Sequence, residues 1–443
     1  MSTSTSEHDF VNWQNLPNEA LIKIYSYLDD SMRCQMSLTC KQWNQAFNTP
    51  VLWRRRYFLF TGFRAMESSV TACKYLRSLG KHLRHVEIEC GHPVLHTARP
   101  IAQALDRFVT QINRLRCIRI LSFKMEHLGI SRAWQFFQSS KSRLVSALCK
   151  FLKSQRHLRR LELSGAHMIS EDGSALINAL GISQARKTLE VLHIENFYEQ
   201  RHTAFSDEAY LNTMRKLTAL RIVFLNYIYI NDTVLNILAK RAGSSLEFLR
   251  IVADSREPYE HNISANAWLD FKKQCPKVKL VFHFLGKLKY SDYTRTLLKG
   301  MPLVDLNIIS WESLPNNRDP DRERMPDVLK YIGDHFPNSL AHFRLSVDHA
   351  VQPALDTSLI HLIGRCCNLT EVSINCKLEL STVESICKMA GDQSRRGLAC
   401  LELRVRGLTG DDMARLALVT QDTLCSLGFR RVELLSEDDA LDD

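Results

Sequence analysis

Apolar residues recur along the chain in one short pattern, L-x-x-[LVIF]-x-[LIF]. Its last three positions alternate apolar, variable and apolar, which is typical of a strand with one buried face. Clear copies begin at Leu83, Leu115, Leu158, Leu189, Leu217, Leu246, Leu303, Leu340, Leu369, Leu398 and Leu424, and a weaker copy begins at Cys275. Six of the eleven intervals are 28 or 29 residues. Such regular spacing indicates a structural repeat rather than scattered leucines.

Helix-like stretches lie between the copies, for example at residues 173–182, 231–242 and 382–391. A strand and a helix repeated about every thirty residues is typical of the leucine-rich repeat. Stacked units share a core and place their strands in one parallel sheet. We therefore expect an α/β solenoid of about twelve repeats over residues 61–435, with a curved parallel sheet inside and helices outside.

Residues 13–60 stand outside the repeat and predict three short helices. Pro17 suits a first helical turn, Ser31 is a candidate N-cap for the second helix, and Pro50 ends the third. So small a unit is expected to enclose Trp43 and Trp53 poorly, because little surface is buried in a short chain. The repeat array and a partner protein are expected to complete its core.

This stretch resembles an F-box, beginning at Leu16-Pro17 and ending at Leu52-Trp53. The resemblance implies docking on the Skp-family adaptor of a cullin–RING (SCF) ubiquitin ligase. Carried over position by position, the expected adaptor-binding residues are Leu16, Pro17, Leu21, Ile24, Leu28, Leu38, Cys40, Trp43, Leu52 and Trp53.

Stretches outside the box, such as "LGKHLRHVEI" and "RHLRRLELSGAHMI", are similar to those of the family around F-box only protein 39. The resemblance implies a non-catalytic substrate receptor, in which the box binds the ligase and the repeats bind the protein to be ubiquitinated. The alternative is a protein-binding repeat scaffold without ligase coupling.

Composition narrows the remaining classes. The chain is 45% hydrophobic and 24% charged, as in globular proteins, and no apolar run is long enough to predict a membrane span. Its start has no secretory signal, so the thirteen cysteines are expected to be reduced thiols in the cytoplasm or nucleus. Residues 1–12 predict a flexible N-terminus, and residues 436–443 an acidic tail.

Known catalytic and metal-binding motifs are missing from the sequence. No C-x-x-C pair, H-E-x-x-H, G-x-S-x-G or phosphate-binding glycine loop occurs. We therefore expect no enzyme activity, cofactor or metal. The net charge of +10 admits nucleic-acid binding as a weaker alternative, since it requires a coherent basic stripe.

The fifth position of the repeat predicts a substrate surface. Arg221, Arg250 and Lys279 occupy it in three consecutive copies, so in-register strands would stack them about 5 Å apart on the concave face. We expect this basic ladder to capture an acidic or phosphorylated segment, unless the acidic tail covers it. The whole expected substrate-binding set is Arg221, Phe248, Arg250, Val252, Lys277, Lys279 and Val281.

Overall fold

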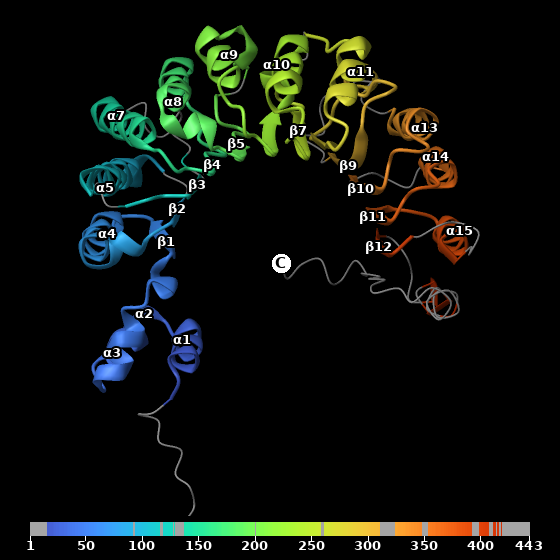
Figure 1. Cartoon of the computed structure of the whole chain (residues 1–443). Coiled ribbons are helices and arrows are strands. Elements are labelled where there is room, and N and C mark those ends of the chain that lie inside the picture. Colours follow the sequence, from blue (N-terminus) through green and yellow to red (C-terminus); the bar gives the residue numbers. More distant parts are fainter. Residues whose placement is uncertain are drawn as a thin grey trace, which may run out of the picture.

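Twelve parallel strands form a single open sheet, in which each strand pairs only with its neighbours in the sequence, β1 to β12. In this computed structural model the strands line the inside of an arc and the helices cover its outside (Figure 1). The structure describes residues 16–91, 94–115, 118–126, 128, 137–199, 201–257, 261–310, 324–347, 353–391, 398–406, 411–412, 414–415 and 418. The predicted α/β solenoid with an inner sheet is confirmed.

The strands are β1 Arg55–Phe60, β2 His85–Cys90, β3 Ser122–Glu126, β4 Arg160–Glu162, β5 Val191–His193, β6 Ile222–Asn226, β7 Phe248–Asp254, β8 Lys279–Leu285, β9 Leu303–Ser310, β10 His342–Val347, β11 Glu371–Lys377 and β12 Cys400–Arg406. The helices that cover them are α4 Ala65–Leu79, α5 Leu95–Arg114, α7 Gln138–Ser154, α8 Ser170–Ile182, α9 Glu208–Met214, α10 Asp232–Ala242, α11 Ala265–Gln274, α12 Tyr290–Thr296, α13 Met325–His335, α14 Pro353–Arg365 and α15 Leu380–Gly391.

Strand alternation separates the two faces of the sheet. In β2, β10 and β11 every second side chain is buried, and the residues between them are partly exposed on the concave side. The buried residues join the inward faces of the helices in one continuous apolar core along the solenoid. Since each repeat supports its neighbours, the concave face is a rigid surface on which side chains have fixed neighbours.

Three strands begin later than the repeat pattern predicts. β3 starts at Ser122 although its copy was placed at Leu115, and β6 starts at Ile222 although its copy was placed at Leu217. In the sheet Val223 lies level with Leu192 and Leu249, so the repeat that contains β6 begins at Leu220. The misplacement arises because two nearby leucines, Leu217 and Leu220, are both buried and either can occupy the first position of the pattern.

The start of β8 shows the same error. Leu280 lies level with Leu249, although the weaker copy at Cys275 places Val278 at that position. The register then shifts between Leu280 and Val281, where β8 meets β9. A bulge of this kind has no counterpart in a pattern of leucines.

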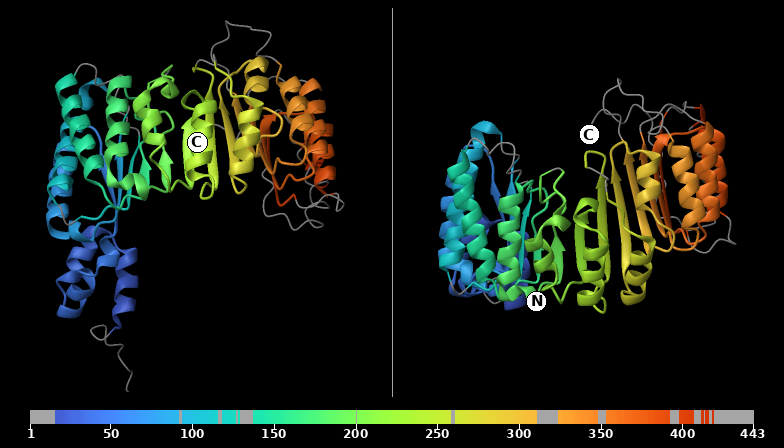
Figure 2. Two further views of the ribbon diagram at one scale, coloured as in Figure 1. Left: turned by 45° about the horizontal axis from the view of Figure 1, so that its top comes forward. Right: turned by 90° about the horizontal axis from the view of Figure 1, so that it is seen from above.

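An N-terminal module of three helices precedes the sheet and projects beyond one end of the solenoid (Figure 2). It consists of α1 Asn18–Tyr27, α2 Asp30–Ser37 and α3 Lys41–Phe47, followed by the 3-10 turn η2 Pro50–Trp53. The three predicted helices are therefore confirmed. The N-cap of α2 is Asp29, not Ser31, because the Asp29 carboxylate accepts a hydrogen bond from the Met32 N–H at 2.8 Å.

The boundary predicted at residues 60 and 61 falls after β1, whose residues Arg55–Phe60 pair in register with β2. The sheet thus begins directly after η2, with a strand that the repeat pattern did not include. The predictions for residues 1–12, for the copy at Leu424 and for the tail at 436–443 lie outside the described residues.

Candidate docking surfaces

The N-terminal module buries part of the residue set expected to contact an adaptor. Leu21 is fully buried, and Trp43 and Trp53 are only 6% and 2% exposed. The expectation that the tryptophans need a partner to cover them is wrong. Neighbouring aromatic rings of the chain itself enclose them, since Tyr25 lies 5.6 Å from Trp43 and Phe47 lies 4.9 Å from Trp53, measured between ring centroids.

The other residues of the expected adaptor set lie nearer the surface. Leu38 is 83% exposed at the end of α2, and Pro17 is exposed at the start of α1. Five further residues pack partly buried against the core of the module, namely Leu16, Ile24, Leu28, Cys40 and Leu52. The structure therefore divides the set into three core residues and seven that reach the surface.

Sequence reasoning missed three exposed apolar side chains of the same module. Tyr27 is 74% exposed, and Met32 and Val51 are about half exposed. Large apolar side chains that gather on one small module are typical of a protein-binding surface. Tyr27 precedes Leu28 and Val51 precedes Leu52, so their position next to expected adaptor-binding residues could have identified them. The comparison with the F-box motif did not include them.

A polar junction joins the module to the sheet. Arg56 of β1 binds both carboxylate oxygens of Asp30 in α2, one of them at 2.7 Å. The guanidinium of Arg56 also lies 4.8 Å from the ring centroid of Tyr75, whose hydroxyl donates to the Trp53 carbonyl at 3.1 Å. The hydrogen bond from Arg56 holds the pKa of Asp30 below its usual value, so this pair is charged at neutral pH.

The predicted basic ladder is absent from the concave face. Arg250 lies level with Phe224 and Val281, and Lys279 lies level with Phe248. Arg221 precedes β6, and its guanidinium binds both carboxylate oxygens of Glu247 at 2.9 Å. The three cations are therefore staggered, because the copies at Leu217 and Cys275 were placed out of phase.

The rest of the expected substrate set is divided by exposure. Lys277 and Lys279 are exposed, and Phe248 is partly exposed beside Phe224, with 5.5 Å between the ring centroids. Val252 and Val281 are almost fully buried. Both valines were expected in the substrate-binding set, but side chains this deeply buried do not offer a contact surface to a partner.

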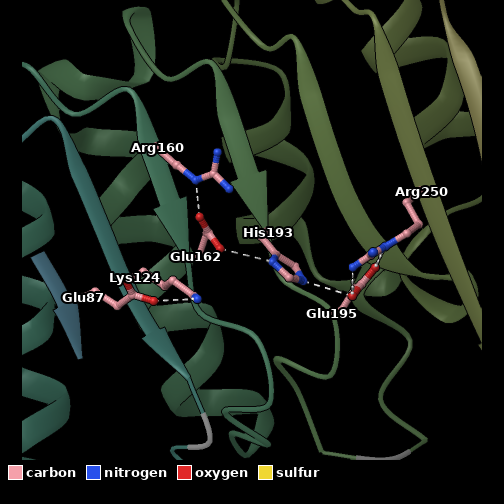
Figure 3. A network of polar contacts seen from close by, with 7 residues as sticks. All are labelled: Glu87, Lys124, Arg160, Glu162, His193, Glu195 and Arg250. Atoms are coloured by element: carbon pink, nitrogen blue, oxygen red, sulfur yellow. Dashed lines mark hydrogen bonds and ion pairs between the residues drawn. The ribbon is translucent and has the colours of Figure 1, made fainter. Parts of the chain in front are cut away.

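A chain of ion pairs occupies the place of the ladder (Figure 3). His193 donates from Nε2 to Glu195 at 2.9 Å, and its Nδ1 lies 3.6 Å from Glu162. Arg250 binds the two oxygens of Glu195 at 2.6 and 2.7 Å, and Arg160 binds Glu162. Because both glutamates are buried, these cations balance charge that would otherwise be costly.

Burial alone would lower the pKa of His193, but the hydrogen bonds to Glu162 and Glu195 outweigh it and raise the pKa above its ordinary value. Burial likewise opposes ionisation of Glu162, yet His193 and Arg160 lower its pKa to about 2. The concave face at β4 to β7 is therefore a fixed pattern of alternating charges rather than a basic strip.

Similar pairs continue on both sides of this centre. Lys124 of β3 binds Glu87 of β2 at 2.8 Å. Arg344 of β10 binds Glu371 of β11 at 2.8 Å and lies 3.8 Å from Asp305 of β9. A partner with a matching pattern of charges would be recognised along several neighbouring repeats.

A buried carboxyl group lies beside the sheet after β7. Asn226 donates from Nδ2 to Glu257 and to Asn196 Oδ1, the latter at 3.0 Å. Burial raises the pKa of Glu257 to about 8, so this side chain is largely neutral at pH 7. Its Oε2 atom has no hydrogen-bond partner among the described residues.

The part of the chain that the structure describes holds no group of three or more His, Cys, Asp or Glu residues suited to a metal ion. Within the same ranges no helix combines the length and apolar character that a membrane crossing needs.

Comparison with known proteins identifies the two parts. Residues 13–59 match the family model described as F-box-like. The chain is 23% identical over 430 residues to F-box/LRR-repeat protein 21 of Bos taurus, covering 94% of this chain and 88% of that protein. It is 24% identical over 417 residues to F-box/LRR-repeat protein 21 of Mus musculus, covering 91% and 85% respectively. The protein is thus built from an N-terminal F-box-like domain and a leucine-rich-repeat solenoid, and over nearly its whole length it is similar to F-box/LRR-repeat proteins.

Proposed function

We propose that the protein is a substrate-recognition subunit of an SCF-type ubiquitin ligase. Its N-terminal module would bind a Skp-family adaptor and, through it, the cullin–RING ligase, while the solenoid would bind the protein to be ubiquitinated. The observation that carries the proposal is the exposed apolar surface of the module, on which Leu38 is 83% exposed. The same module matches the F-box-like family.

The proposed role is non-catalytic. A ligase subunit of this kind accelerates ubiquitin transfer by holding a substrate lysine close to the activated ubiquitin. The acceleration comes from proximity and orientation of the reacting groups. The ion-paired junction at Arg56 and Asp30 supports this role, because a substrate can only be positioned by a solenoid that is firmly joined to its docking module.

On the concave face we propose that exposed residues contact the substrate. Lys277 and Lys279 offer cations, and Phe248 offers apolar surface level with Lys279. Arg221 would act together with Glu247, to which it is paired ahead of β6. Arg250 would act through its pairing with Glu195, and the buried Val252 and Val281 would support the surface from beneath.

The cellular location and the closer relationship stay proposals. Every cysteine that the structure describes is a free thiol, which supports a cytoplasmic or nuclear location. The narrower resemblance to the family around F-box only protein 39 stays a prediction, since the relatives reported above carry the name F-box/LRR-repeat protein 21.

Co-purification of the adaptor tests the proposal. Leu38→Asp should abolish recovery of a co-expressed Skp-family adaptor, because it places a charge on the exposed apolar surface of the module. Ile182→Asp is the matched control, since Ile182 is also exposed but lies on α8 of the solenoid. If wild type and both variants recover no adaptor, the chain is a repeat scaffold without ligase coupling. Equal recovery by both variants would show that the adaptor binds elsewhere.

A further inference from the structure

A hollow of about 770 Å³ lies where α5 and α7 end and the chain turns into β3 and β4. Its wall comes from the last residues of both helices and from the loops that follow them, together with Gln184. The N-terminal ends of the strands are on this side, and β1 begins here directly after the N-terminal module. The hollow therefore lies at the edge of the sheet formed by the N-terminal ends of the strands, the same edge at which β1 follows the module.

Cationic and polar side chains surround the opening without a partner of opposite charge. Arg119, Lys153, Arg156 and His157 line the hollow and are exposed, and no acidic residue lines it. Among the described residues none of these four forms an ion pair with Asp or Glu, in contrast to Arg160 on the adjoining strand, which binds Glu162. Their charge is available to a ligand.

A second hollow lies beside the first, between α4 and α5. Lys74, Arg77, Arg107 and Arg114 line it, and Asp106 is its one acidic lining residue. The two hollows together concentrate positive charge on the repeats of β1 to β4, although the concave face nearby is balanced. A localised basic surface of this kind attracts a negatively charged partner and steers its approach.

Stabilisation of helix ends accounts for only part of this charge. Lys153 lies in the last turn of α7, where a cation interacts favourably with the negative end of the helix dipole. Arg119, Arg156 and His157 come after the helices have ended, so the dipole effect, which decays within one turn, does not require them.

The floor of the first hollow distinguishes between two classes of partner. Leu115 and Ile118 are partly exposed there, and no Phe, Tyr or Trp side chain lines either hollow. Single-stranded nucleic acids are bound by basic grooves whose aromatic residues stack on the bases. A peptide, by contrast, can place a phosphate on arginines and an apolar side chain on the floor beside them.

We propose that the hollow between α5 and α7 binds a phosphorylated segment of a partner protein, with Arg119, Lys153 and Arg156 holding the phosphate and Leu115 and Ile118 receiving a neighbouring apolar side chain. The segment would belong to the substrate, so the identity of the partner rests on the proposed function. Binding of the peptide itself does not depend on the adaptor.

Two pools of short fluorescent peptides test the site, one with a central phosphoserine and one with serine, both with randomised flanks. Fluorescence anisotropy with the full chain should show tighter binding of the phosphorylated pool. The triple variant Arg119→Glu, Lys153→Glu, Arg156→Glu should weaken that binding by about tenfold, since hydrogen bonds to charged groups are lost. Lys240→Glu, Arg241→Glu, Lys272→Glu is the control, because it makes the same charge change on exposed positions of α10 and α11. Equal melting temperatures of the two variants would show that both are folded.

Three results would overturn the proposal: no preference for the phosphorylated pool, equal weakening in both variants, or tighter binding of a random single-stranded oligonucleotide than of the peptides. The last would assign the surface to nucleic acid. Adaptor recovery, measured on the same proteins, separates this site from the ligase role. A triple variant that loses the peptide and keeps the adaptor supports the site, whereas peptide binding by a wild-type chain that recovers no adaptor contradicts only the ligase role.

Discussion

Arg56 and Asp30 form a bidentate ion pair across the junction between the first strand of the solenoid and the second helix of the N-terminal module. Most of the Arg56 side chain is buried, whereas half of the Asp30 side chain is exposed. A planar guanidinium matches a carboxylate in this way and fixes the angle between the two groups. The pair therefore orients the module as well as attaching it.

Arg56→Ala should lower the free energy of unfolding by about 1 kcal/mol, a modest value because Asp30 is partly exposed to solvent. It should also increase the range of module positions, seen as a larger radius of gyration in small-angle X-ray scattering. Arg55→Ala serves as the control, since the neighbouring Arg55 is exposed. Identical scattering and melting of the two variants would argue against an orienting role.

Trp53→Ala should cost about 3–5 kcal/mol, as expected for removal of a buried aromatic side chain. Thermal unfolding followed by circular dichroism would measure this loss. Leu38→Ala should leave the melting temperature unchanged, because Leu38 is exposed. Loss of adaptor binding in the Trp53 variant would then reflect a damaged module, and an unchanged melting temperature would contradict the packing described here.

Glu257→Gln should stabilise the protein at alkaline pH. The pKa of Glu257 is about 8 in the folded chain and ordinarily 4.5, so wild-type stability is fully present below pH 4.5 and falls as the pH rises towards 8. Glutamine does not titrate and retains an oxygen for Asn226. The variant should gain on the order of 2 kcal/mol at pH 8 and little at pH 4.5, measured by urea unfolding. An equal gain at both pH values would mean that ionisation is not the cause.

His193→Gln should destabilise the protein most under mildly acidic conditions. Because the folded pKa of His193 is raised, its charged form contributes stability that is fully present below the ordinary value of 6.5 and is lost as the pH rises through the folded pKa. The difference in melting temperature between wild type and variant should therefore be larger at pH 6 than at pH 9. A difference that grows with pH would contradict the pairing with Glu162 and Glu195.

Charge reversal should separate structural from exposed cations of the concave face. Arg250→Glu leaves Glu195 buried beside a second carboxylate, so it should cost more than about 3 kcal/mol in stability. Lys279→Glu should leave stability unchanged within about 0.5 kcal/mol, because Lys279 is exposed. If Lys279→Glu also leaves recovery of a substrate unchanged in affinity purification, the proposed contact at this position is wrong.

The sequence was sufficient to predict the solenoid and the helices of the module, because a repeated strand period and helical spacing are local signals. The sequence was insufficient to predict which residues of neighbouring strands lie level with one another in the sheet. The second buried leucine near β6 and the weak copy at Cys275 misplaced the predicted residues by three and two positions, enough to replace a predicted basic ladder by ion pairs. A shift of an odd number of residues moves a side chain to the other face, so small errors of phase alter the whole surface.

The sequence also failed to predict that the chain itself buries the two tryptophans. Trp43 and Trp53 match a docking motif, but their spacing in the sequence does not predict which side chains pack around them. Rings from α1, α3 and α4 do so, including Tyr75 at 6.0 Å from Trp53 between centroids. Contacts between distant segments decide such burial, and an apolar pattern does not encode them.

Because the sheet is open and joins the module near one end, the solenoid has the geometry of a lever whose base is held by the Arg56–Asp30 ion pair. β12 lies eleven strands beyond β1, which corresponds to roughly 50 Å along the sheet. Any tilt that this pair permits would therefore displace the far repeats more than the repeats next to the junction. Cargo held near the base of the lever would be presented steadily, and cargo held at its tip would sample many lysine positions.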